Sequence, residues 1–120
     1  MLLVEDEALV RQLTQEILRR NGYLVLVAAD GLEALQVVRD HPGDIDLLLT
    51  DVVMPRMSGH ELVELARPLR PSMRILYVSG YSEQAIERQG ELTAGIELLA
   101  KPFTPGVLTA KIREILDRTP

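Results

Sequence analysis

The feature that most constrains the fold is a regular alternation of two kinds of segment along the chain. Short, continuous apolar runs are typical of strands buried on both faces, and longer amphipathic stretches are typical of helices. The apolar runs are Leu2–Val4, Leu24–Ala28, Leu47–Leu49, Ile75–Val78 and Ile96–Leu99. A helical stretch follows each of these five runs, so the sequence predicts a strand–helix unit repeated five times.

The helical stretches carry apolar residues at spacings of three or four, as Leu9, Leu13 and Ile17 do in the first of them. Glycine and proline segments limit their extent, since Asn21-Gly22 ends the first and Pro68 limits the third. The first predicted helix runs from about Glu7 to Arg20, and the second runs through Leu32, Leu35 and Val38 and ends at His41-Pro42-Gly43. The third begins at a Ser58 cap and runs through Leu62 and Leu65, and the fourth begins at a Ser82 cap and runs through Ile86. The fifth begins near Thr104-Pro105 and runs through Leu108, Ile112, Ile115 and Leu116.

Strands buried on both faces and joined by helices imply a parallel sheet between two helical layers. Right-handed crossovers leave few topologies, and five such units suit the doubly wound order 2-1-3-4-5. We therefore predict an α/β fold with a five-stranded parallel sheet, a flavodoxin-like three-layer sandwich. A chain of 120 residues fits one domain, 1–120.

Composition excludes several classes of function. The net charge is −5, so the chain lacks the basic face that direct nucleic-acid binding needs. No apolar run approaches the roughly 20 residues of a membrane helix. We expect no signal peptide, because Met1-Leu2-Leu3-Val4 runs straight into Glu5-Asp6-Glu7 without a basic start or a longer apolar stretch. There is no cysteine, hence no disulfide or cysteine–metal site. We expect a cytoplasmic domain without direct membrane contact.

Polar residues follow four of the five apolar runs: Glu5 and Asp6, then Asp51, Ser79 and Lys101. Ligands of such sheets bind beyond the carboxyl ends of the strands, so these side chains are expected at one rim. Three acids there would repel one another unless a cation joined them. A set of oxygen ligands suits a hard ion; Mg²⁺ fits best, and Mn²⁺ could substitute.

This set of side chains has a definite chemistry. An aspartate carboxylate can act as a nucleophile toward phosphorus and form an aspartyl phosphate. The transfer mainly needs positioning and neutralisation of charge. A cation held by Asp6 and Asp51 would neutralise phosphoryl oxygens, Lys101 would pair with another oxygen, and the Ser79 hydroxyl would donate a hydrogen bond to a third.

With these residues, the chain resembles the receiver domains of bacterial response regulators and hybrid histidine kinases. The likeness covers essentially the whole chain, and the four motifs in this order are highly specific. The matching segments are Val4-Glu5-Asp6-Glu7, Leu49-Thr50-Asp51-Val52-Val53-Met54-Pro55 with Ser58-Gly59, Val78-Ser79-Gly80, and Lys101-Pro102-Phe103.

The resemblance implies a role for each motif residue. Asp51 matches the phosphorylated aspartate, and Ser79 and Lys101 match the switch hydroxyl and the lysine of the family. The metal site would consist of Asp6 as a direct ligand, Glu5 acting through water, Asp51, and the main-chain carbonyl of Val53.

The resemblance also implies a function within a two-component phosphorelay. A histidine kinase or a histidine phosphotransfer domain would dock near the first helix and donate its phosphoryl group to Asp51. The domain would catalyse its own phosphorylation and a slow dephosphorylation, without being a standalone metabolic enzyme. Phosphorylation would reshape the surface of the fourth helix, the fifth strand and the fifth helix.

The motifs around Ser79 and Lys101 look most like the C-terminal receiver of a hybrid sensor histidine kinase. A longer parent chain would then supply kinase or output domains, and this domain could be the cytoplasmic part of a membrane-bound kinase. A single-domain regulator is the alternative. We expect a monomer or weak dimer.

Two departures from the family pattern bear on function. Leu98 stands where many members carry a switch tyrosine or phenylalanine. Its absence is the one feature that favours the alternative of a receiver-like interaction module that is not phosphorylated. Val53 and Tyr81 stand at positions that often tune dephosphorylation, and neither is an obvious water-activating group, so we expect slow self-hydrolysis.

Other readings fit less well. An aspartyl phosphatase would need a second acid at the position of Val53, and a flavin module would need a phosphate-binding glycine loop. Taken singly, Glu5 and Asp6 could be acids favouring a helix dipole, and Asp51 a turn residue. Those separate explanations would have to coincide at four strand ends.

Overall fold

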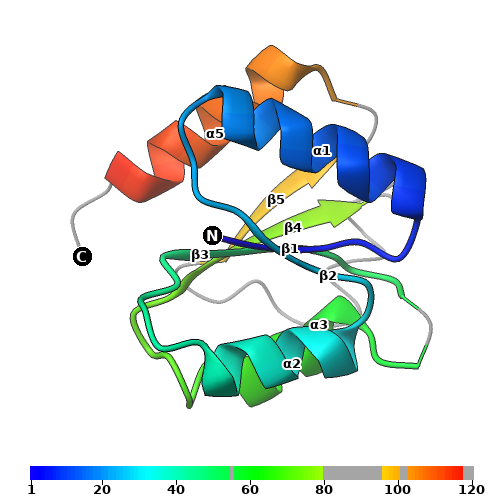
Figure 1. The fold of residues 1–120 in the computed structure, drawn as a ribbon, viewed down its shortest axis with the longest axis vertical. Coiled ribbons are helices and arrows are strands. Elements are labelled where there is room, and N and C mark those ends of the chain that lie inside the picture. Colours follow the sequence, from blue (N-terminus) through cyan, green and yellow to red (C-terminus); the bar gives the residue numbers. More distant parts are fainter. Residues whose placement is uncertain (55, 80–95, 101–102, 118–120) are drawn as a thin grey trace.

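The structure is a computed structural model, and it describes residues 1–54, 56–79, 96–100 and 103–117. A parallel sheet forms the middle layer, with α1 and α5 on one face and α2 and α3 on the other (Figure 1). The described strands are β1 (Leu2–Val4), β2 (Leu26–Ala28), β3 (Leu47–Asp51), β4 (Arg74–Ser79) and β5 (Ile96–Ala100). The described helices are α1 (Ala8–Arg20), α2 (Gly31–Asp40), α3 (Gly59–Ala66) and α5 (Pro105–Asp117).

The sheet has the order β2-β1-β3-β4-β5, and all of its pairings are parallel. This confirms the predicted fold class and strand order. From β1 the chain adds β2 on one side of the sheet, and it adds β3, β4 and β5 on the other side. The strand order therefore reverses between β1 and β3, which are direct neighbours although α1, β2 and α2 separate them in the chain. In doubly wound sheets this switch point is where ligands bind.

Two apolar clusters hold the layers together, one on each face of the sheet. On the α2 and α3 face, β1, β3 and β4 contribute buried side chains such as Val4, Leu48 and Ile75. On the opposite face, Leu3, Leu49 and Leu76 of the same strands pack with α1 and α5. Successive residues of a strand point to opposite faces, so strands in the middle of the sheet are apolar throughout.

The helix boundaries follow the predicted signals closely. Ser58 caps α3, because its side-chain oxygen accepts a hydrogen bond from the Glu61 N–H at 3.1 Å. Gly22, with φ of 88°, follows the end of α1, as the Asn21-Gly22 pair predicted. Asp30, to which the sequence assigned no role, caps α2 by accepting from the Glu33 N–H at 2.8 Å.

Two details differ from the sequence prediction. The second strand begins at Leu26 rather than Leu24, and Leu24 is 90% exposed. The pairing of β2 with β1 begins at Leu26, and an apolar run does not reveal which of its residues are paired. In α1, the predicted stripe lies largely at the surface, with Leu9 68% and Leu13 58% exposed, while Thr14 and Leu18 are buried.

The predicted helix from Ser82 through Ile86 lies outside the described residues. Within the described ranges, no helix is long and apolar enough to cross a membrane.

Candidate functional site

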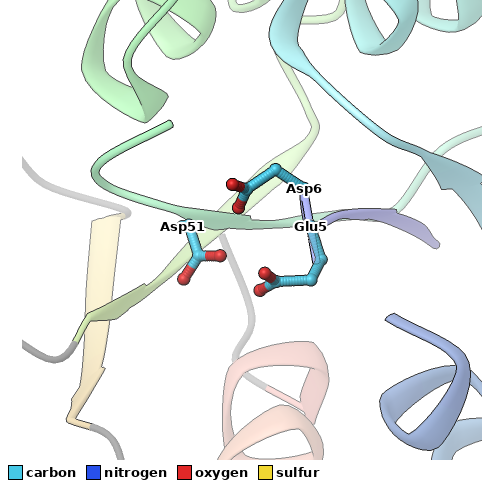
Figure 2. Close-up of side chains that lie close together, drawn as sticks. All are labelled: Glu5, Asp6 and Asp51. Carbon is cyan, nitrogen blue, oxygen red and sulfur yellow. The ribbon is translucent and has the colours of Figure 1, made fainter. Parts of the chain in front are cut away.

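The site lies at the carboxyl ends of β1 and β3, the two strands at the switch point of the sheet. Their register places Val4 beside Thr50, so Glu5 and Asp6 emerge next to Asp51. Figure 2 shows the three acidic side chains gathered at this edge. Each of them offers a carboxylate oxygen such that these atoms all lie within 4.8 Å of one another. The predicted acidic cluster is therefore present in the structure.

The three acids differ in exposure. Glu5 is 5% and Asp51 7% exposed, whereas Asp6 is exposed in the turn that leads into α1. Burial disfavours an ionised carboxylate, and so does a neighbouring like charge. The two buried acids therefore gain from any partner that supplies positive charge or hydrogen bonds. Asp6 keeps the cluster open to solvent and to an incoming ligand.

Glu5 is held at its side chain and at both of its main-chain groups. Its carboxylate accepts a hydrogen bond from the Glu7 N–H at 3.2 Å, at the start of α1. Its N–H donates to the carbonyl of Ala28 at 3.1 Å, which continues the pairing of β1 with β2. Its carbonyl accepts from Nη1 of Arg11 at 2.8 Å. The role of Arg11 could not be predicted from the sequence, because an arginine at a helical position gives no signal of its tertiary partner.

Asp51 is the last residue of β3, and the loop after it folds back tightly. The Val52 N–H donates to the carbonyl of Val78 at 3.3 Å, and the Gly59 N–H donates to the carbonyl of Val52 at 2.7 Å. The Thr50 hydroxyl donates to the carbonyl of Asp51 at 3.0 Å. These bonds fix the main chain on both sides of Asp51, and therefore the position from which its carboxylate projects.

The remaining predicted site residues fall at or beyond the limits of the described chain. Ser79 ends β4, one residue after Val78, which pairs with Asp51. This places the main chain of Ser79 at the same edge of the sheet. Lys101 lies outside the described residues, immediately after β5. Val53 lies in the loop two residues after Asp51, and its apolar side chain is 48% exposed.

The donor set suits a hard divalent cation. Carboxylate oxygens from the end of β3 and from the segment between β1 and α1 converge, and Asp6 is open to water. Mg²⁺ is bound in this way, by a few carboxylates with several retained waters. The residues present therefore fit a magnesium ion. Combined with a buried carboxylate nucleophile, the arrangement can support phosphoryl transfer to Asp51.

Comparison with known proteins gives one consistent family. Residues 1–113 match the family described as response regulator receiver domain. The chain is 38% identical over 118 residues to the sensor kinase CckA of Brucella abortus (strain 2308). That alignment covers 98% of this chain but 12% of the kinase, so the chain corresponds to a small part of that relative.

Solved structures agree with the sequence comparison. The receiver domain from the hybrid histidine kinase CckA superposes with a TM-score of 0.83 at 36% identity, covering 97% of each chain. The receiver domain of the sensor histidine kinase PA1611 from Pseudomonas aeruginosa PAO1 superposes with a TM-score of 0.83 at 27% identity, covering 98% of this chain and 96% of that one. That structure has a magnesium ion coordinated in its active site cleft.

Proposed function

The chain belongs to the response regulator receiver domain family of two-component systems, and on this premise we propose that Asp51 is the residue that accepts the phosphoryl group. The observation that carries the proposal is the convergence of Asp51 with Glu5 and Asp6 at the switch point of the sheet. A buried aspartate at the end of a central strand, with two acids beside it, is the arrangement that metal-assisted phosphorylation of a carboxylate requires.

The metal site in this proposal consists of Asp6, Asp51 and the main-chain carbonyl of Val53, with Glu5 acting through water. Bound Mg²⁺ would neutralise the charge of the phosphoryl oxygens and of the acids that hold it. Mn²⁺ has the same preference for oxygen ligands and would serve in its place. The magnesium ion in the cleft of the PA1611 receiver domain supports this assignment.

The chain's own contribution is a positioned nucleophile. A carboxylate oxygen of Asp51 attacks phosphorus, an O–P bond forms, and the N–P bond of the donor phosphohistidine breaks. The electron pair of the broken bond returns to the imidazole nitrogen of the donor. Lys101 and Ser79 complete the proposal as partners of the phosphoryl oxygens, the lysine by charge and the serine by a hydrogen bond.

The donor is a histidine kinase or a histidine phosphotransfer domain that docks along α1. Leu9 and Leu13 lie one helical turn apart on α1 and are 68% and 58% exposed, which leaves an apolar strip on a helix that begins beside the acidic cluster. Exposed apolar side chains at helical spacing fit the apolar face of a partner helix. Docking there would bring a partner's histidine near Asp51.

The parent protein and the output surface form the last part of the proposal. The similarity to the receiver of a sensor kinase supports a place within a hybrid histidine kinase, whose kinase domain would lie elsewhere in a longer chain. Phosphorylation would change the surface that includes β5 and α5. Leu98 of β5 is partly buried against the core on the α2 and α3 face and cannot act as an aromatic switch, so the change would be carried by the segment after Ser79.

The test is phosphorylation of the purified chain by acetyl phosphate, followed by an intact mass. A gain of one phosphoryl group that needs Mg²⁺ and disappears in Asp51→Asn is the expected result. No gain, together with no binding of beryllium fluoride and Mg²⁺, would instead indicate an interaction module that has kept the fold. Beryllium fluoride binding without phosphorylation would point to strict dependence on a protein donor.

A further inference from the structure

We propose that Arg11 is a positioning residue for the metal site, because it fixes the peptide unit from which Asp6 projects. The inference rests on the proposed function, in which Asp6 is a metal ligand. It adds a residue of α1 that has no ligand role of its own. Arg11 would thus act on the affinity for Mg²⁺ through the main chain.

The contact that carries this inference joins α1 to the end of β1. Arg11 lies in the first turn of α1, and its Nη1 donates a hydrogen bond to the carbonyl oxygen of Glu5 at 2.8 Å. The bond is partly buried, so it competes less with water than a surface contact does. A hydrogen bond from a charged donor is also stronger than one between neutral groups.

The carbonyl of Glu5 and the N–H of Asp6 belong to the same planar peptide unit. A bond that fixes the oxygen therefore fixes the plane, and with it the direction in which Asp6 leaves the strand. The other groups of Glu5 are already held, its N–H by Ala28 and its carboxylate by Glu7. Arg11 holds the remaining group, the Glu5 carbonyl, which belongs to the peptide unit that leads into Asp6.

Asp6 has the greatest need of such support. It is the exposed member of the cluster, and it lies in the turn between β1 and α1 rather than in either element. Its carboxylate must nevertheless lie close enough to Asp51 for both to share one ion. A second group that orients a metal ligand commonly changes metal affinity by about 10-fold or more when it is removed.

A simpler role for Arg11 predicts the opposite sign. If its charge merely offset the repulsion among the three acids, removing it would raise the local negative potential and tighten Mg²⁺ binding. If Arg11 positions Asp6, removing it weakens Mg²⁺ binding although a positive charge has been lost. The direction of the change in the dissociation constant therefore separates the two roles.

The experiment is calorimetric titration of the purified chain with MgCl₂, for the wild type and for Arg11→Met, Arg11→Lys and Arg19→Met. Arg19 is an exposed arginine in the last turn of α1, so its replacement removes the same charge from the same helix far from the site. We expect Arg11→Met to raise the dissociation constant by about 10-fold, and Arg19→Met to leave it unchanged. Arg11→Lys keeps the charge and one donor and should fall between wild type and Arg11→Met.

Each other outcome has a definite meaning. Unchanged or tighter Mg²⁺ binding in Arg11→Met overturns the inference, even if its melting temperature falls, because the contact would then serve stability alone. If Arg11→Met does not fold, Arg11→Lys decides, since a dissociation constant equal to the wild type's would overturn the inference. A wild-type chain that binds no Mg²⁺ would refute the metal site of the proposed function itself.

Discussion

A methyl group on Gly59 would collide with the main-chain oxygen of Asp51 and would lie 3.0 Å from the carbonyl carbon of the same residue. It would also lie 3.1 Å from Cα of Val52. Gly59 is the first residue of α3, and its N–H donates to the carbonyl of Val52. Helix α3 therefore begins directly against the end of β3, and only a residue without a side chain fits there.

Gly59→Ala should disturb both the fold and the site. The added methyl group meets backbone atoms, which cannot rotate away, so either the loop or the end of β3 must move. Overpacking of this kind costs about 1–3 kcal/mol in the free energy of unfolding, measured by urea denaturation. Because the displaced strand end carries Asp51, phosphorylation by acetyl phosphate should slow as well.

Gly106→Ala is the matched control, a glycine in the first turn of α5. Among the residues that the structure describes, a methyl group there would meet only Thr104 Oγ1, at 4.0 Å. Alanine favours a helix over glycine by about 0.5–1 kcal/mol, so this variant should be slightly more stable than the wild type. Equal losses of stability in both variants would show that the crowding at Asp51 is not the cause.

Asp51→Asn should stabilise the domain in the absence of metal. The change removes one buried charge from a cluster in which Glu5 is also buried, and it keeps nearly the same shape. We expect the free energy of unfolding to rise in buffer with a chelator, because two acids of the cluster then remain instead of three. Adding Mg²⁺ should then raise the melting temperature of the wild type and have little effect on the variant. Asp44→Asn, at an exposed aspartate, should show neither effect.

Val53→Asn should shorten the lifetime of the phosphorylated form. Val53 is half-exposed two residues after Asp51, and its side chain offers no atom that could hydrogen-bond an attacking water. An amide at this position could orient that water. The measurement is the loss of the phosphoryl group with time after removal of acetyl phosphate, followed by intact mass. A wild-type half-life no longer than that of the variant would contradict the expected slow self-hydrolysis.

Tyr77 should make stability depend on pH in the alkaline range. Its hydroxyl is buried and has no hydrogen-bond partner among the residues that the structure describes. Burial raises the pKa of Tyr77 from 10.0 to about 12, helped by the negative charge of Glu64 and opposed by Arg67. The folded state therefore keeps its proton at a pH where the unfolded chain has lost it.

The raised pKa of Tyr77 gives this contribution a definite sign. The stabilisation is fully present below pH 10 and is lost as the pH rises toward 12, by about 1.4 kcal/mol per pH unit. Tyr77→Phe should remove this part of the decrease in the free energy of unfolding with pH, measured by urea denaturation at several pH values between 10 and 12. A variant with the same slope as the wild type would mean that other groups account for the loss.

Most of the fold could be predicted because its central strands β1, β3 and β4 are buried and therefore mostly apolar. Runs such as Leu47–Leu49 are apolar throughout, and the polar residues that follow them mark the carboxyl edge of the sheet. Asp51 could be placed beside Glu5 and Asp6 from the strand order alone. Ser58 could be predicted as a cap because its side chain acts within one turn of its own helix.

Tertiary features left no comparable signal in the sequence. The spacing of Leu9 and Leu13 predicted a helix correctly, but it did not identify the buried face, which is centred on Thr14 and Leu18. The bond from Arg11 to Glu5 depends on how α1 lies against β1, and nothing in the spacing of the residues reveals it. Ser79 and Lys101 remain predictions as partners of the phosphoryl group.

The adjacency of β1 and β3 also bears on how the domain unfolds. Asp6 and Asp51 lie far apart in the chain, because α1, β2 and α2 come between β1 and β3. The pairing of β1 with β3 in the sheet brings the two acids together. An ion held by both would tie these segments like a removable cross-link. Magnesium would then slow the separation of β1 from β3, and the main-chain amides of these two strands would be the last to exchange their hydrogens. The unfolding rate of the domain would therefore depend on how fully the site is occupied.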